Sequence, residues 1–161
     1  MVVQTTYSID HAQAYAGMKA DQQINNTVSR LNKGATNIVF GKAIVSDGED
    51  GGKLPTGASV AADFNGVAMR ELNRALADGD LLGAIAGKDF TVITHGVVWV
   101  VVLDTVAKDA PVYMRIGATG LGDFSGVVGA GITAGILLPN VKFITGGVNG
   151  DLVQISIGVG G

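Results

Sequence analysis

The hydrophobic pattern is dominated by a seven-residue apolar run, Val97–Leu103, which is rich in β-branched side chains. A turn signal at His95-Gly96 precedes the run, and the polar pair Asp104-Thr105 follows it. A run this short and this branched is typical of a β-strand buried on both faces. A membrane-spanning helix needs roughly 20 apolar residues, so the pattern favours a buried strand over a membrane segment.

Further short apolar segments recur along the chain, with glycine, aspartate and asparagine between them. The predicted strands are Asn37–Val45, Phe64–Arg70, Phe90–Thr94, Val98–Leu103, Val112–Ile116, Val141–Ile144 and Leu152–Ile157. Several follow one another at a spacing of roughly 8–12 residues, which is typical of a sandwich or barrel. One short helix is predicted over Glu71–Asp78, closed by Gly79. We therefore expect a mainly β protein with a compact β-barrel or sandwich body.

Residues 1–35 differ from the rest of the chain because they are polar and carry only isolated apolar residues. These are Tyr7, Ile9, Tyr15, Met18, Ile24, Val28 and Leu31. The segment fits either a short helix over Ile9–Ala20, with Asp10 as its N-cap, or a mostly extended arm. Because it cannot form a core alone, we expect an N-terminal arm over residues 1–35 and a β-barrel-like body over residues 36–161. The arm then lies on its own body or reaches onto a neighbour.

Charge is scarce along the chain. Charged residues make up 16% of it, against roughly 25% in average globular proteins. The mean hydropathy is +0.38. A surface this short of charge is expected to bury part of itself against another chain, which favours a homo-oligomer. The net charge of −3 and the scattered lysines and arginines disfavour nucleic acid as a partner. The N-terminus lacks the pattern of a signal peptide, and we expect no membrane partner.

Candidate chemistry is weak throughout. Gly129–Ala134 matches a dinucleotide-binding pattern, but Gly135 and Pro139 leave no room for the helix that such a turn must open. Asp47–Gly51 hints at a calcium loop, yet the position that requires a bidentate glutamate is Ala58. The chain has no cysteine, and its two histidines show no metal-ligand spacing. We therefore predict no catalytic residue, no cofactor and no metal site. We expect the Gly- and Ala-rich stretch from residue 126 to 135 to pack its backbone closely against its own sheet or another subunit.

Several segments carry a recognisable pattern when they are taken in order along the chain. These segments are Ala14–Asp21, Val28–Leu31, Ile38–Ala43, Lys53–Thr56, Phe64–Arg70, Thr94–Val100, Asp109–Tyr113 and Gly150–Ile155. Together they resemble the structural cement (capsid decoration) proteins of tailed bacteriophages. Thr94–Val100 is similar to the family's G-x-V-W-V strand. Asp109–Tyr113 is similar to its G-x-x-V-Y strand, with Asp109-Ala110 where Ala-Gly-Asp is more usual. Gly131–Lys142 departs from the family pattern.

The resemblance implies a β-barrel-like body, a mobile N-terminal arm and attachment to the outer surface of the major capsid protein lattice, commonly as a trimer. It implies no enzymatic activity. It places the protein on the outside of the virion capsid after synthesis in the host cytoplasm. From the residues themselves, we predict that Tyr7, Ile9, Tyr15 and Met18 are anchors in an interface with the capsid or another subunit. They are apolar side chains in a segment too polar to fold alone.

Three other functions stay open from the sequence. A tail-tube or baseplate β protein would form rings or stacked tubes rather than a closed trimer. A sugar-binding module is disfavoured because the chain has one tryptophan and three tyrosines. An enzyme is the least favoured, since no local arrangement marks a nucleophile or a pair of acids.

Overall fold

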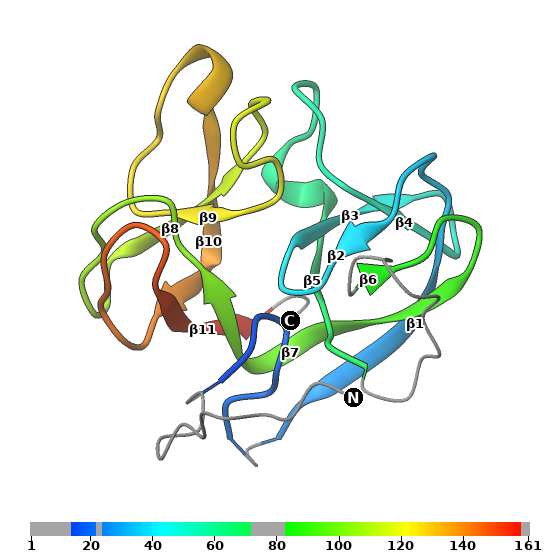
Figure 1. The fold of residues 1–161 in the computed structure, drawn as a ribbon, viewed down its shortest axis with the longest axis horizontal. Coiled ribbons are helices and arrows are strands. Elements are labelled where there is room, and N and C mark those ends of the chain that lie inside the picture. Colours follow the sequence, from blue (N-terminus) through cyan, green and yellow to red (C-terminus); the bar gives the residue numbers. More distant parts are fainter. Residues whose placement is uncertain (1–13, 22–23, 72–82, 159–161) are drawn as a thin grey trace, which may run out of the picture.

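The computed structural model describes residues 14–21, 24–71 and 83–158 (Figure 1). The strands are β1 (Asn26–Asn32), β2 (Ile38–Val39), β3 (Ala43–Asp47), β4 (Gly51–Lys53), β5 (Phe64–Ala68), β6 (Gly83–Ala84), β7 (Asp89–Val101), β8 (Pro111–Arg115), β9 (Phe124–Ser125), β10 (Gly135–Phe143) and β11 (Leu152–Gly158). Two short 3-10 helices are η1 (Ala61–Asp63) and η2 (Gly131–Thr133). The prediction of a mainly β protein is confirmed.

The first half of the chain closes into a small barrel. Strands β1, β4, β3, β5 and β7 are hydrogen-bonded in that order, and β7 pairs back with β1. The β1–β4 pair is parallel, whereas the other pairs are antiparallel. Closure leaves few strand edges exposed, which removes the usual route to edge-to-edge aggregation.

Strand β7 extends beyond the first barrel and begins a second one. Its later residues pair with β11, and the sheet continues through β10 and β8 to β9. A parallel bridge between Val102 and Phe124 brings β9 back to the end of β7. Figure 1 shows the two halves side by side, with β7 running along both. The predicted β-barrel is therefore present, and one long strand serves both halves.

The turn predicted at His95-Gly96 is wrong, because β7 continues through it. On one edge of the strand, His95 lies opposite Gly158 and Gly96 lies opposite Ile157. On the other edge His95 lies opposite Asn26. Gly96 has a φ of +122°, a value that glycine reaches without a Cβ clash. The glycine therefore bends the strand, and pairing on both edges keeps it continuous.

The other predicted boundaries were partly right. The segment Asn37–Val45 forms two strands, β2 and β3, because Gly41 turns the chain with a φ of +84°. The helix predicted over Glu71–Asp78 falls almost wholly on residues 72–82, which lie outside the described residues. Of the helix considered over Ile9–Ala20, the described part has a turn and a β-bridge at Lys19 instead.

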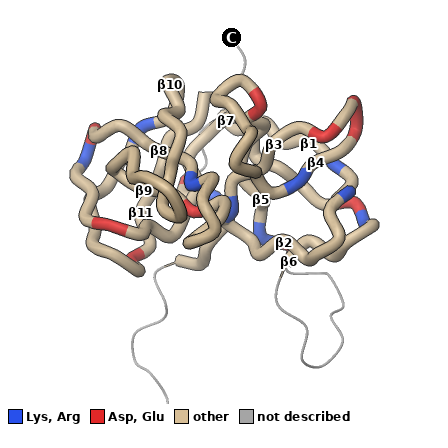
Figure 2. Tube along the Cα trace, turned by 90° about the horizontal axis from the view of Figure 1, so that it is seen from above, with Lys and Arg blue, Asp and Glu red and all other residues tan. Residues whose placement is uncertain are grey.

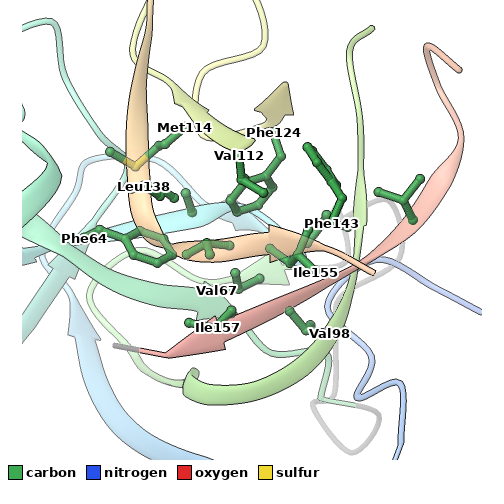
Figure 3. Packing of buried hydrophobic residues seen from close by; sticks show 14 of the residues in the cluster. Phe64, Val67, Val98, Val112, Met114, Phe124, Leu138, Phe143, Ile155 and Ile157 are labelled. Carbon is green, nitrogen blue, oxygen red and sulfur yellow. The ribbon is translucent and has the colours of Figure 1, made fainter. Parts of the chain in front are cut away.

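Two groups of buried apolar side chains fill the body. The larger group draws on β3, β5, β7, β8, β9, β10 and β11, and Figure 3 shows residues such as Val98, Phe124 and Phe143 converging within it. The smaller group includes Ile44, Phe90 and Val92. In the run Val97–Leu103, Val98, Val100 and Val102 are fully buried. On the opposite face Trp99 is 8% exposed, whereas Val97, Val101 and Leu103 are only partly buried. The prediction of a strand buried on both faces is therefore correct for one face and only partly correct for the other.

An ion pair ties the two barrels together. The Lys42 ammonium, just before β3, lies 2.7 Å from a carboxylate oxygen of Asp123, just before β9. Beside it, the Ala43 N–H donates to the Gly122 carbonyl over 2.7 Å. Burial raises the pKa of the Asp123 carboxyl above its ordinary value of 3.8, although the hydrogen bond and the charge of Lys42 act in the opposite direction.

This raised pKa sets the sign of a pH effect on stability. Between pH 3.8 and the raised value, folded Asp123 holds a proton that the unfolded chain has released. The contribution of Asp123 to the free energy of unfolding therefore decreases as the pH rises through that window. We expect the free energy of unfolding of Asp123→Asn to increase relative to that of the wild type as the pH rises through this window. Urea unfolding at a series of pH values measures the difference. The opposite trend would mean that Lys42 outweighs burial.

Candidate functional site

The four residues predicted as interface anchors do not all fall within the described chain. Tyr7 and Ile9 lie outside the described residues. Tyr15 is 49% exposed, and Met18 is half-buried. The structure thus places the second pair on the surface of the barrel, beside the later half of β7.

Residues 17–20 pair with β7 through backbone hydrogen bonds and a single β-bridge at Lys19. The Gly17 N–H donates to the Trp99 carbonyl over 2.8 Å, and the Trp99 N–H donates to the Met18 carbonyl over 2.9 Å. The Ala20 N–H donates to the Val97 carbonyl over 2.9 Å. This segment and β1 occupy the same edge of β7, because Lys19 lies opposite Val98 and β1 follows along the strand. The start of the described chain is therefore fastened to the body.

A close backbone approach at Gly17 makes this docking possible. Gly17 has a φ of +80°, and a Cβ there would lie 2.6 Å from the Ala68 carbonyl oxygen. Its own carbonyl accepts a 2.8 Å hydrogen bond from the Arg70 N–H. The Arg70 guanidinium also lies over the Tyr15 ring, 4.2 Å from its centroid, in a cation–π contact. Tyr15 is therefore held in one place while half of its surface faces solvent.

A second exposed apolar surface lies at the end of the second barrel. Residues Gly126–Leu137, the apolar loop, connect β9 through η2 to the start of β10. Its exposed apolar side chains are Val127 (51%), Val128 (58%), Ile132 (67%) and Leu137 (46%). The Gly135 N–H donates to the Val128 carbonyl over 2.6 Å, so the two ends of the loop lie side by side. Sequence reasoning selected this stretch for its glycines but did not identify its exposed valines and isoleucine.

A buried polar network holds both ends of the apolar loop. The Asp104 carboxylate accepts from the Arg115 guanidinium at 3.1 Å and from the Ser125 hydroxyl at 2.6 Å. Its other oxygen accepts from the Gly126 N–H, where the loop begins. Arg115 also donates to the Thr133 carbonyl near the end of the loop. Arg115 is only 5% exposed, so its charge relies on this carboxylate.

Comparison with known proteins identifies the family. The family model described as "Structural cement protein (E217 gp24/Pam3 gp6)" matches residues 3–158. The chain belongs to this structural cement family. The match bears out the resemblance and favours a capsid cement role over the alternative of a tail-tube or baseplate protein.

One solved structure shares the fold of this chain. A chain from the structure titled "The capsid of Myoviridae Phage XM1" superposes with a TM-score of 0.75 over 98% of both chains, at 15% identity. The head fibre gp8.5 N base of bacteriophage phi29 is less similar, with a TM-score of 0.42, 12% identity and coverage of 84% of this chain and 95% of that one. A search of curated proteins found no match. As a cement family member, the chain is a capsid-associated structural protein of the virion.

The candidate chemical motifs adopt the structures of ordinary turns. In Gly129–Ala134 the only regular element is η2, and β10 starts at Gly135, so no long helix opens there. The acidic stretch Asp47–Gly51 is the turn between β3 and β4, where Asp50 pairs with Lys33 and Asp47 with Lys53, each over 2.8 Å. Within residues 14–21, 24–71 and 83–158, no three His, Cys, Asp or Glu side chains gather closely enough to hold a metal ion.

Two of the hollows on the surface lie beside β10. A hollow of about 310 Å³ between η1 and β10 has mainly small or apolar lining residues, among them Ala61, Phe64 and Leu138. A wider one of about 650 Å³ is lined by Asp109, Lys142 and Ser156, among others. None of the helices in the described part of the chain has the length and apolar character needed to cross a bilayer.

Proposed function

We propose that this cement protein binds the outer surface of the major capsid protein lattice and stabilises the phage head without catalysing a reaction. The observation that carries the proposal is the family match over residues 3–158. Synthesis in the host cytoplasm followed by addition to the outside of the capsid belongs to the same proposal.

Attachment is proposed to run through the N-terminal arm, with Tyr7, Ile9, Tyr15 and Met18 as its apolar anchors. In this proposal residues 1–35 form the arm and residues 36–161 the body, with β1 as the part of the arm that is paired into the barrel. The pairing of residues 17–20 with β7 supports it, because the arm then starts from a fixed point on the body. Tyr15 supports it as well, since the contact with Arg70 orients a ring that is 49% exposed.

We further propose that the protein acts as a trimer. A single arm offers few apolar anchors, whereas stable attachment buries roughly 1,000 Å² or more. Three arms on one particle raise the effective concentration of each arm at the capsid, which strengthens attachment without any new type of contact. Symmetry gives each arm an equivalent site on the lattice.

Truncation at residue 13 tests the arm. Deleting residues 1–20 would also remove the Gly17 and Met18 backbone groups that bond to Trp99, so the cut is better placed before Ala14. We expect a chain of residues 14–161 to keep the wild-type circular dichroism spectrum and melting temperature. We expect it to bind capsids stripped of cement protein at least about tenfold more weakly, because anchors such as Tyr7 and Ile9 are gone. Co-sedimentation with purified capsids measures the binding.

A matched control is Val60→Ala, which shortens an exposed apolar side chain on the η1 loop, outside the proposed arm. We expect this variant to bind capsids as the wild type does. Undiminished binding by the truncated chain would contradict attachment through residues 1–13. The contact would then have to lie within residues 14–161, which keep Tyr15 and Met18.

A further inference from the structure

The apolar loop, Gly126–Leu137, presents an apolar surface that the N-terminal attachment does not use. Figure 1 shows the η2 loop at one side of the second barrel and the segment that begins at residue 14 at the other side, along β7. Four apolar side chains between Val127 and Leu137 are about half exposed or more, and Ile132 is the most exposed at 67%. Exposed apolar side chains that gather on one loop are typical of a contact with another protein.

The apolar loop is also held in one conformation before any partner arrives. Asp104 and Arg115 fix its two ends through Gly126 and Thr133. The Thr119 N–H donates to the Ile132 carbonyl over 2.9 Å, which secures the middle of the loop. A surface that is already ordered loses little conformational entropy on association, so more of its burial remains as binding energy.

Charge points to the partner. From Phe124 to Val141 the chain has no charged residue, and in Figure 2, where Lys and Arg are blue and Asp and Glu are red, most of the tube is tan. If a charged surface were placed against this loop, its charged groups would lose their hydration and would meet no opposite charge in return. Each copy of this chain has a net charge of −3, so two copies repel each other. The repulsion is weakest where the two facing surfaces carry no charge. The loop of a second copy meets this requirement.

We propose that copies of this chain contact one another loop to loop through Val127, Val128, Ile132 and Leu137. The inference rests on the proposed assembly of the cement protein into an oligomer, and it assigns the surface that makes the contact. It leaves capsid binding to the N-terminal arms, and the loop contact joins copies that each carry one arm.

Sedimentation velocity of the purified full chain tests the contact. We expect the wild type to sediment as an oligomer and Ile132→Asp to weaken self-association at least about tenfold, because the contact would bury a carboxylate in each copy. Val128→Lys should weaken self-association in the same way. It replaces Ile132→Asp in the test if circular dichroism shows that Ile132→Asp is not folded. The matched control is Val148→Asp, a residue 55% exposed on a different turn, which should keep the wild-type mass. A monomeric wild type, or folded loop variants of wild-type mass, would overturn the proposal.

Cross-linking reports the loop-to-loop contact directly. The chain has no cysteine, so Ile132→Cys introduces a single thiol at the tip of the loop. Under mild oxidation we expect disulfide-linked dimers of Ile132→Cys to form faster than those of Val148→Cys. Equal rates would overturn the loop-to-loop contact. Capsid co-sedimentation and sedimentation velocity of the loop variants and of the chain of residues 14–161 separate the two proposals. Truncation of the arm should weaken capsid binding and leave the number of subunits unchanged, whereas loss of the loop contact should lower the number of subunits.

Discussion

Replacing Gly66 by alanine is expected to lower the free energy of unfolding by at least about 3 kcal/mol. Gly66 lies in β5, has a φ of +143°, and sits where the register between β3 and β5 shifts. A Cβ built there would lie 2.1 Å from the Ile93 carbonyl oxygen, an atom of the β7 backbone that cannot rotate away. The substitution would therefore force apart two strands of the first barrel. Urea unfolding followed by tryptophan fluorescence measures the loss.

Two other glycines separate backbone strain from steric clash. At Gly87 the φ is +71° but a Cβ would meet no atom within 4 Å, so Gly87→Ala should cost only about 1–2 kcal/mol. At Gly57 the space is also open and the φ lies outside the left-handed region, so Gly57→Ala should be close to neutral. If Gly66→Ala cost no more than Gly87→Ala, β5 and β7 would be able to separate easily at this point.

Removing the Asp104 carboxylate is expected to cost about 3–5 kcal/mol, because Asp104→Ala leaves the Arg115 guanidinium buried without its counter-ion. The same change removes the acceptor for Ser125 and for the Gly126 N–H at the base of the apolar loop. We therefore expect faster hydrogen exchange across the loop as well as a lower unfolding midpoint. Chemical denaturation and hydrogen-exchange mass spectrometry measure the two effects.

The matched control is the exposed ion pair between Asp47 and Lys53, whose side chains are 32% and 39% exposed. Asp47→Ala should cost only about 0–1 kcal/mol, since water solvates the lysine that remains. Equal losses for Asp104→Ala and Asp47→Ala would show that the network around Asp104 contributes no more than a surface pair. In that case the apolar loop would owe its conformation to its backbone hydrogen bonds.

The strands were predictable where the apolar pattern is strong and local. Predicted segments around Phe64, Val98, Val112 and Ile155 all lie in strands. Prediction failed at His95-Gly96, because a histidine before a glycine has the same local signature in a turn and in a bent strand. Pairing with Asn26 on one edge and with β11 on the other decides between them, and both partners are remote in sequence.

The candidate site divides in the same way. The sequence alone distinguishes the polar first 35 residues, the isolated apolar residues Tyr15 and Met18 within them, and the Gly- and Ala-rich stretch from residue 126 to 135. It does not reveal that Gly17 and Met18 bond to Trp99, or that Asp104, Arg115 and Ser125 meet beneath the apolar loop. These contacts join residues that only the closed barrels bring together.

The sequence by itself determined the β class, the order of most strands and the resemblance to cement proteins, because alternation and turn residues act over a few neighbouring positions. Only the tertiary structure decided that β7 serves two barrels. Only the tertiary structure shows that the start of the described chain is bonded to the edge of β7. It also decided which apolar side chains remain exposed on the loop. Burial and strand pairing depend on which distant segments meet, and no local pattern records that.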